Sequence, residues 1–386
     1  MNIPINKNLP TTPSSSLSPS TPSVPPTTSL KRKRSHLTIA DVKDGYTTRP
    51  VSNLLWNQEF LTCYGSNGCH PVCIGDTFKN GRYKVIRKLG YGSSSTVWLA
   101  QDTSTDTLVA LKIHIAHESG STSRREVTAL EALHPNKDTS KLFPVLCDDF
   151  VHNGPNCAHR CIVMQVLGPS LRLVIESYYD ERIDPEDLLR LARQVLEATA
   201  TLHEAGFAHR DLDADNIVFS FRNMAKLSRK AFIKKLGKLE TAELLRVDGS
   251  PPDDYLPKQL VGAAEWDGWI DEDEEDIRFI DAGESFRVGD RISSTRDANP
   301  TTTELETDFK ERVPEPQLAV LLPVLQGLMR FRPEDRVSAR DALALLDQGN
   351  SKDASGSSGA DESSGAKESS NEAELSSEEE SSSERE

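Results

Sequence analysis

Apolar and polar residues alternate along the chain between residues 81 and 115, a pattern typical of β-strands with one buried face. The alternation predicts three consecutive strands at 83–89, 97–99 and 108–115, with turns at 91–95 and 102–107. Because such short connections join neighbouring strands, an antiparallel sheet is the simplest arrangement.

Apolar residues take a helical spacing at 123–133 and again, more strongly, after residue 184. Asp184 is a favourable N-cap for the second of these helices, and Pro185 suits its first turn. Gly206 is expected to end it, because glycine favours the position that follows a helix.

Further elements are expected around and after this helix. A short apolar strand at 161–167 precedes it, and one later helix spans 318–329. The last helix starts at Ser338, whose hydroxyl forms a capping-box-like pair with Asp341. Strands therefore come first and helices later, and we predict an α+β fold with two lobes of different class.

Composition changes at both ends of this region. Residues 1–30 are rich in Ser, Thr, Pro and Asn, residues 350–386 in Ser, Glu and Gly, and neither segment can bury enough apolar surface to fold. The second segment holds eleven acidic and three basic residues, so it contributes −8 (−11 + 3) of the formal net charge of −15. We divide the chain into a disordered head at 1–55, a lead-in at 56–80, an N-terminal lobe at 81–168, a C-terminal lobe at 169–346 with an insert at 220–276, and a disordered acidic tail at 347–386.

No apolar run is long enough to span a bilayer and no signal-peptide core is found, so we expect a soluble intracellular protein without a membrane partner. The basic cluster at 31–34 fits recognition by nuclear import receptors or polyanions, and equally a solvated charge run. A zinc site is one interpretation of the close spacing of Cys63, Cys69, His70 and Cys73. The cysteines are sparse and form no paired C-x-x-C motif, which favours free thiols in a reducing compartment.

A glycine-bearing turn between the first two predicted strands is the first sign of chemistry. It consists of Leu89, Gly90, Tyr91, Gly92, Ser93, Ser94, Ser95, Thr96 and Val97. Glycines let backbone amides approach phosphate oxygens, and the valine is placed to cover a purine. Taken alone, these residues fit a simple hairpin turn better.

A lysine ends the next strand, in the run of Val109, Ala110, Leu111 and Lys112. A buried ammonium needs an anionic partner, and Glu126 on the following helix can supply it. A surface lysine is the alternative. The order of glycine turn, strand lysine and helix glutamate nevertheless favours a nucleotide site.

Two further motifs carry acidic residues. Residues 209–216 match H-R-D-L-x-x-x-N, the catalytic-loop signature of protein kinases. Asp211 would orient a substrate hydroxyl and accept its proton, and Asn216 would hold a metal ion on the phosphates. Asp281 ends a strand-like run and precedes Ala282 and Gly283, and its carboxylate is a hard ligand that suits Mg²⁺.

With these residues in order, the chain resembles the eukaryotic protein kinases over residues 73–346. More narrowly, it is similar to the SR-protein kinases, which phosphorylate Arg/Ser-rich splicing factors, at 70–76 before the first strand, at 95–100 in the glycine loop and at 166–168 in the inter-lobe hinge. That family also has a long insert between the catalytic loop and the metal aspartate, as this chain has at 220–276.

The resemblance implies ATP and Mg²⁺ as cofactors and a protein substrate of the Arg/Ser-rich type, without direct contact to nucleic acid. It assigns the nucleotide to Gly90, Gly92, Val97 and Ala110, its α- and β-phosphates to Lys112 held by Glu126, the base to Asp211, and Mg²⁺ to Asn216 and Asp281. Met164 would be the gatekeeper, and the backbone of Gln165, Val166 and Leu167 would meet the adenine. A nuclear and cytoplasmic location is expected.

Four departures from the family pattern bear on activity. Ser95 replaces the third glycine, and Ala282 replaces a bulky residue between Asp and Gly. Asp213 stands where such kinases place a lysine that neutralises the γ-phosphate, and a carboxylate there repels the same charge. Between Asp281 and Arg336 the sequence has no A-P-E motif, whose glutamate would ordinarily pair with that arginine, and no Asp-x-Trp-Ser-x-Gly helix.

The motifs favour an ATP-dependent protein serine/threonine kinase of the SR-protein-kinase type. An ATP-binding scaffold without phosphate transfer is the alternative from another class, and a truncated product of an active parent enzyme is a third. Ser-Glu runs such as residues 376–380 fit acceptor sites for acid-directed kinases, although a plain solubilising tail is favoured.

Overall fold

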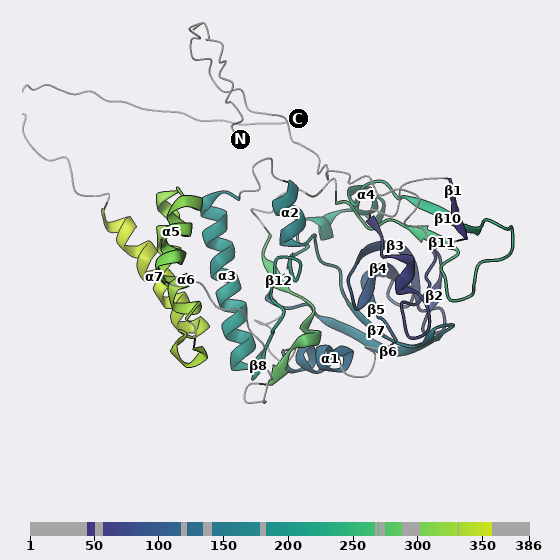
Figure 1. Ribbon diagram of the computed structural model, residues 1–386, viewed down its shortest axis with the longest axis horizontal. Helices are drawn as coiled ribbons and strands as arrows, with labels where there is room; N and C mark the ends of the chain where they lie inside the picture. The colour runs from purple at the N-terminus through teal and green to yellow at the C-terminus, as the bar shows by residue number, and fades with distance from the viewer. Residues whose placement is uncertain are drawn as a thin grey trace, which may run out of the picture.

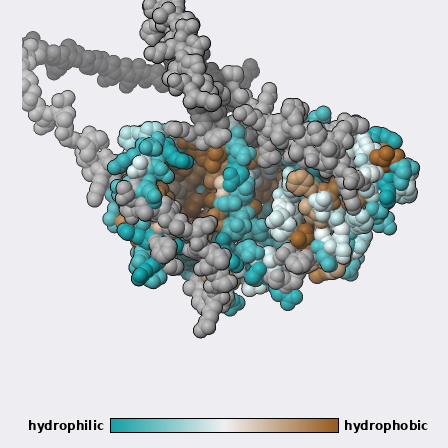
Figure 2. Space-filling view, in the orientation of Figure 1, coloured by the Kyte–Doolittle hydropathy of each residue, from teal (hydrophilic) through white to brown (hydrophobic). Residues whose placement is uncertain are grey.

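A computed structural model describes residues 45–50, 57–116, 122–133, 141–177, 183–266, 269, 275–287, 302–330 and 332–356. A lobe built around a β-sheet and a lobe built from helices lie side by side (Figure 1). Hydrophilic residues cover much of the outer helices, and apolar residues are visible mainly in the recesses between elements (Figure 2). The two lobes of different class predicted from the sequence are therefore present.

The first lobe contains a six-stranded antiparallel sheet in the order β2-β3-β4-β5-β7-β6. Its strands are β2 (Thr77–Phe78), β3 (Tyr83–Tyr91), β4 (Ser95–Asp102), β5 (Thr107–His114), β6 (Leu146–Gly154) and β7 (Cys157–Gln165). The three strands predicted in succession are β3, β4 and β5. Apolar residues of alternating positions, such as Val85, Trp98 and Leu111, meet in the core on one face of this sheet.

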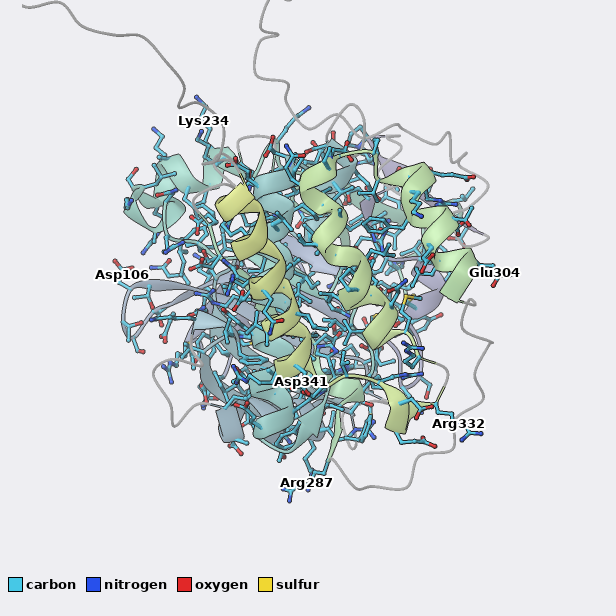
Figure 3. The ribbon with its side chains drawn as sticks, turned by 90° about the vertical axis from the view of Figure 1, so that its left-hand side faces the viewer. Asp106, Lys234, Arg287, Glu304, Arg332 and Asp341 are labelled. Atoms are coloured by element: carbon cyan, nitrogen blue, oxygen red, sulfur yellow. The ribbon has the colours of Figure 1, made fainter. Side chains whose placement is uncertain are left out.

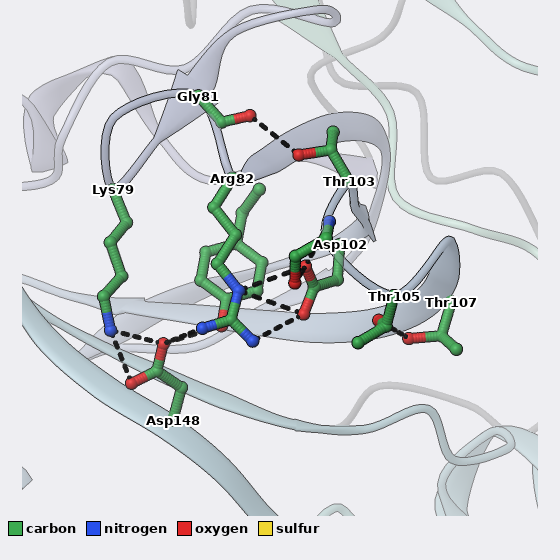
Figure 4. A network of polar contacts seen from close by, with 10 residues as sticks. Lys79, Gly81, Arg82, Asp102, Thr103, Thr105, Thr107 and Asp148 are labelled. Carbon is green, nitrogen blue, oxygen red and sulfur yellow. Dashed lines mark hydrogen bonds and ion pairs between the residues drawn. The ribbon is translucent and has the colours of Figure 1, made fainter.

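Charged side chains tie three strands together at the end of the sheet away from the glycine turn (Figure 4). Arg82 binds the Asp102 carboxylate with Nη2 at 2.8 Å and lies 3.5 Å from Asp148. Lys79 and the hydroxyl of Tyr83 also bind Asp148, at 2.6 Å each. The Arg82 guanidinium and Ser104 hydrogen bonds hold the pKa of Asp102 far below its usual range, although partial burial opposes this.

Helix α1 (Thr122–Leu133) follows the sheet strand that carries Lys112, and it packs Val127 and Leu130 against Ile162 and Met164 of β7. Its observed bounds agree with the predicted helix at 123–133. Glu126 and Leu130 are four residues apart, so they share one side of the helix. The packing of Leu130 therefore also turns Glu126 toward the sheet.

The insert at 220–276 folds back onto the first lobe. It contains η6 (Met224–Lys226), α4 (Arg229–Lys235), β10 (Thr241–Arg246) and β11 (Gln259–Val261), and β10 also pairs with β1 (Tyr46–Arg49). Phe232 and Trp266 of the insert pack in one cluster with Leu99 and Val166. The guanidinium of Arg87 donates to the carbonyls of residues 237 and 238, at 2.7 and 2.8 Å. The insert is therefore part of the folded core.

The second lobe is built around α3 (Pro185–Glu204), preceded by α2 (Leu171–Ser177). Asp184 caps α3 by accepting the Glu186 backbone N–H at 3.0 Å, and Gly206 follows it with φ +85°, as the sequence predicts. One side of α3 packs on two short ladders, made of β9 (Ile217–Phe219) with β12 (Ile277–Phe279) and β8 (Phe207–Ala208) with β13 (Phe286–Arg287).

The other side of α3 packs against η9 (Pro316–Val320), α6 (Leu321–Leu328) and α7 (Ala339–Gly356). Helix α5 (Thr302–Arg312) packs beside α6, and η10 (Pro333–Asp335) lies between α6 and α7 in the sequence. Figure 3 shows the last helices in front. Ser338 and Asp341 form the expected cap of α7, with the Asp341 backbone N–H donating to the Ser338 hydroxyl at 3.1 Å. The helix runs on to Gly356, ten residues past the boundary at 346 that the composition indicates.

Helix α5 was not predicted, because its first residues fall in a polar, Thr-rich stretch. The basic cluster at 31–34, the acidic residues 271–274 and the tail from residue 357 lie outside the described residues. Within the described residues, the structure contains no helix that is long and apolar enough to cross a membrane.

Candidate functional site

Lys112 of β5 joins two carboxylates that are far apart in the sequence. Its Nζ lies 2.9 and 2.8 Å from the two carboxylate oxygens of Glu126 on α1, and 2.8 Å from Oδ1 of Asp281. The side chains of Lys112 and Glu126 are 5% and 1% exposed, whereas that of Asp281 is 30% exposed. The lysine and the helix glutamate pair as the sequence predicts, and the aspartate joins them.

The charges in this network stabilise one another. Burial alone would lower the pKa of Lys112, but the Glu126 and Asp281 carboxylates raise it. Burial opposes ionisation of both carboxyl groups, yet the Lys112 ammonium holds the pKa of each below its usual range. His114 adds to this, with Nε2 3.1 Å from Glu126. All three members are therefore charged at neutral pH.

The catalytic-loop motif lies next to Asp281. The backbone N–H of Ile280 donates to the Asn216 carbonyl at 3.0 Å, and Nε2 of His209 lies 2.9 Å from the Ile280 carbonyl. Nδ2 of Asn216 donates to the backbone carbonyl of Asp211 at 2.8 Å and lies 3.2 Å from its carboxylate. These contacts bring Asp211, Asn216 and Asp281 to one place, although 70 residues separate the first from the last.

Asp213 shapes the loop between Asp211 and Asn216. Its Oδ1 accepts the backbone N–H groups of Asp215 at 2.8 Å and Asn216 at 3.1 Å. The side chain of Asp215 in turn binds Arg172 of α2 at 2.7 Å. A carboxylate thus takes the position where the family has a lysine, and it caps the loop that holds the other residues.

The turn after Asp281 depends on a glycine. Asp281 has φ +58° in the left-handed region, and the turn η8 (Ala282–Glu284) follows it. A Cβ on Gly283 would lie 2.5 Å from Cγ2 of Thr122, the first residue of α1. Only glycine therefore lets the turn approach the start of α1 this closely.

Several of the predicted nucleotide residues lie on Lys112's own strand or on the strands paired with it. Ala110 and Lys112 are paired with Met164 and Ile162 of β7, and Val97 of β4 is paired with Lys112. Met164 and Val166, the predicted gatekeeper and hinge residues, are buried. The glycine turn closes with the Gly92 backbone N–H donating to Ser95 at 2.9 Å. Leu89 to Ser94 and Thr96 belong to this turn and its flanking strands, and Gln165 and Leu167 flank Val166.

Three residues near the site were not singled out from the sequence. Glu284 ends η8 and lies within ion-pair distance of Arg125 and Arg210. The sequence motifs do not indicate that Glu284, Arg125 and Arg210 lie together, because the three residues come from separate segments of the chain. The only sequence sign is the position of Glu284 directly after Gly283.

Comparisons with known proteins identify the family that shares this arrangement of motifs. Residues 83–242 match the family described as "Protein kinase domain". Residues 83–242 therefore carry the sequence of a protein-kinase domain. The matched residues include Lys112, Glu126 and the catalytic loop, and they end before Asp281, which contacts Lys112.

Three relatives of the kinase domain support the narrower resemblance. "Protein kinase dsk1" of Schizosaccharomyces pombe is 38% identical over 173 residues, which cover 44% of this chain and 32% of that protein. "SRSF protein kinase 3" of Homo sapiens is 34% identical over 201 residues, covering 50% and 34%. "Serine/threonine-protein kinase SKY1" of Saccharomyces cerevisiae is 32% identical over 170 residues, covering 42% and 23%. The resemblance to SR-protein kinases is confirmed, and the matches span about a third or less of these relatives.

The zinc alternative has no support in the structure. Among the described residues, no group of three His, Cys, Asp or Glu side chains is arranged to hold a metal ion. His70 instead packs against His152 and His159, with ring centroids 4.7 and 5.0 Å apart.

The donor set fits Mg²⁺ and nucleotide phosphates. Mg²⁺ in kinases takes one or two protein oxygens, and the remaining ligands come from phosphates and water. Asp281 offers a partly exposed carboxylate, and Asn216 uses its amide nitrogen for Asp211, which leaves the side-chain oxygen for a cation. Lys112 supplies the fixed positive charge next to them.

Proposed function

We propose that this chain is an ATP-dependent protein kinase that transfers the γ-phosphate of ATP to serine in Arg/Ser-rich proteins. The contact of Lys112 with both Glu126 and Asp281 carries the proposal, because phosphate transfer in protein kinases needs the lysine–glutamate pair and the metal aspartate in place together. This chain holds both contacts around one nitrogen atom.

Each residue has a role in the proposed reaction. Bound Mg²⁺ supplies charge stabilisation on the phosphates, and Asn216 and Asp281 would hold it. Lys112 orients the α- and β-phosphates, and Asp211 orients the substrate hydroxyl and accepts its proton. The chain forms no covalent intermediate, so the rate depends on positioning and electrostatics.

The substrate class rests on relatives. "SRSF protein kinase 3" is similar to 50% of this chain, and its name supports splicing factors of the Arg/Ser-rich type as substrates. The basic cluster at 31–34 supports a protein shared between nucleus and cytoplasm, because such clusters are read by import receptors.

One experiment tests the function directly. Mg²⁺-dependent ATP binding and phosphate transfer to an Arg/Ser-repeat peptide are measured on the purified chain, with Asp211→Asn and Lys112→Met as controls. Transfer that disappears in both variants establishes the kinase. A Lys/Ser-repeat peptide of equal charge tests whether arginine itself is recognised. Absence of both binding and transfer in the wild type would overturn the proposal.

A scaffold that binds ATP without transferring phosphate is the second candidate, and Asp213 favours it. A carboxylate at this position repels the γ-phosphate charge that a lysine would stabilise. ATP binding by the wild type without transfer to any Arg/Ser peptide would decide for the scaffold.

A further inference from the structure

Lys88 and Glu59 form a buried ion pair that the proposed reaction does not use. Nζ of Lys88 lies 2.7 Å from each carboxylate oxygen of Glu59, and the two side chains are 2% and 5% exposed. The hydroxyl of Tyr64 donates to the same carboxylate. These contacts favour the ionised form of Glu59, so a pair of opposite charges lies inside the sheet lobe.

The pair lies where three segments of the chain meet. Glu59 belongs to the segment that precedes the sheet, and Lys88 belongs to β3. In the preceding segment, Nδ2 of Asn57 donates to the carbonyl of Ala263 at 2.9 Å, and the backbone N–H of Ala263 donates to the carbonyl of Asn57 at 2.8 Å. The backbone N–H of Ala264 donates to the carbonyl of Lys88 at 3.0 Å. The preceding segment and the insert therefore both hold Lys88.

Lys88 also lies at the base of the glycine turn. It comes two residues before Gly90 in β3, and the pairing of β3 with β4 is irregular between these two residues. Its Nζ lies 4.9 Å from the ring centroid of Trp98 on β4. Nε1 of Trp98 in turn donates to the hydroxyl of Thr96 at 3.0 Å. Lys88 thus contacts both strands that lead into the turn.

Stability alone does not explain a pair of charges at this place. Transfer of two charges out of water is costly, and apolar side chains of similar volume stabilise a core as well or better. An ion pair adds direction, because the ammonium has to lie between the two carboxylate oxygens. An irregular ladder holds the backbone less firmly. The side-chain contact is therefore placed to fix the base of the glycine turn.

We propose that Glu59 is a positioning residue for the nucleotide: it holds Lys88, and Lys88 keeps the glycine turn where its backbone amides reach the phosphates. The role rests on the proposed kinase function. Glu59 acts through Lys88 and touches neither the nucleotide nor the reacting atoms.

The expected effect is on ATP affinity. Apparent affinity falls in proportion to the fraction of molecules that hold the binding conformation. Loss of the pair should therefore raise the KM for ATP about 5- to 20-fold. The kcat should stay within about twofold, because saturating ATP selects the molecules whose turn is in place.

The test uses a variant in which the pair is replaced by apolar side chains. The full chain with Glu59→Met, Tyr64→Phe and Lys88→Met together leaves no buried charge or hydroxyl without a partner, so the fold is kept. This triple variant should show the raised KM with an unchanged kcat. Glu59→Asp keeps the charge on a shorter side chain, and its KM should lie between those of the wild type and the triple variant.

The matched control is the ion pair at the opposite end of the same two strands. Arg82 of the segment before β3 binds Asp102 of β4 at 2.8 Å. Arg82→Met with Asp102→Asn removes this pair and keeps an acceptor for the backbone N–H of Ser104. The KM for ATP of this control should stay within about twofold of the wild type.

Hydrogen exchange separates this role from the kinase function. Without nucleotide, residues 89–97 should exchange faster in the triple variant and at the wild-type rate in the Arg82 and Asp102 control. If the wild type neither binds ATP nor transfers phosphate, the proposed function fails and the exchange rates still test whether the pair holds the turn. Unchanged exchange of residues 89–97 in the triple variant, or a wild-type KM for ATP in that variant, would overturn the assignment of Glu59.

Discussion

The network around Lys112 and the loop around Asp211 belong to one site, but they differ in how deeply they are buried. Lys112 and Glu126 are almost fully buried, whereas Asp211 and most of its loop face solvent and Asn216 is half-buried. A buried charge is costly unless it is paired, so the network must form for the sheet and α1 to pack. The exposed loop has no such constraint. The same site therefore contains residues that stabilise the fold as well as residues whose proposed role is in chemistry alone.

Lys112→Met tests the buried part of this site and should have the largest effect on stability and on phosphate transfer. It leaves two carboxylates without their common cation, one of them fully buried, and the expected loss of unfolding free energy is about 3–5 kcal/mol. Phosphate transfer should be lost as well. Chemical denaturation and transfer assays measure the two effects.

Lys84→Met is the matched control, because Lys84 is an exposed lysine of the neighbouring strand β3. Its unfolding free energy should stay within about 0.5 kcal/mol of the wild type. A Lys112→Met variant that is as stable as Lys84→Met would contradict the view that the network supports the fold.

Asp211→Asn tests the exposed side. It keeps the size of the side chain and removes the base, so transfer should fall by about 100-fold or more. Unfolding free energy should change by less than about 0.5 kcal/mol, because no buried charge is uncovered. Asp308→Asn on α5, which is also exposed, should change neither quantity. A large loss of stability in Asp211→Asn would show that the loop also supports the fold.

Burial also explains how much of the fold the sequence predicts. The alternation in β3 to β5 and the spacing in α1 and α3 reflect contact with one core, and these elements were predicted close to their observed bounds. Helix α5 has no such stripe: among its residues Glu304 at the start and Lys310 and Arg312 at the end favour a helix only through the helix dipole. That signal is too weak to stand out in a Thr-rich stretch.

The site follows the same rule. Lys112 and Glu126 could be paired from sequence, because a lysine in a buried strand needs an acid nearby. Glu284 could not, because it is exposed and its two arginines come from segments that only the tertiary fold brings together. The insert was recognised as an insertion, but the packing of Phe232 and Trp266 on the sheet lobe was not predicted, since it depends on distant partners.

A cluster of buried histidines should make the stability of the fold depend on pH. Burial and the neighbouring His152 and His159 lower the pKa of His70 to about 3, so the folded state keeps this ring neutral where the unfolded chain protonates it at about 6.5. Stability is full above pH 6.5 and falls as the pH drops toward 3. His70 alone should account for about 2 kcal/mol between pH 7 and pH 5.

Unfolding of the wild type and of His70→Phe at several pH values tests this expectation. Phenylalanine keeps a ring beside Phe78 and cannot take up a proton, so the variant should lose less stability on acidification. His203→Phe replaces an exposed histidine at the end of α3 and shows how much a single histidine outside the cluster contributes. Equal slopes for the wild type and His70→Phe would refute the assignment.

Asp213→Lys should have the smallest effect. It changes both the charge near the γ-phosphate and the cap on the exposed loop, and these two changes act in opposite directions. The lysine restores positive charge for the γ-phosphate, so transfer should rise about 3- to 10-fold if that charge limits the reaction. The change also removes the acceptor of the Asp215 and Asn216 backbone N–H groups, at a cost of about 1 kcal/mol in stability. Asp213→Asn is the matched control, because it keeps an acceptor oxygen and removes only the repulsion. Faster transfer in both variants would show that the carboxylate restrains the reaction by its charge, whereas slower transfer in the lysine variant alone would show that the cap it forms on the loop matters more.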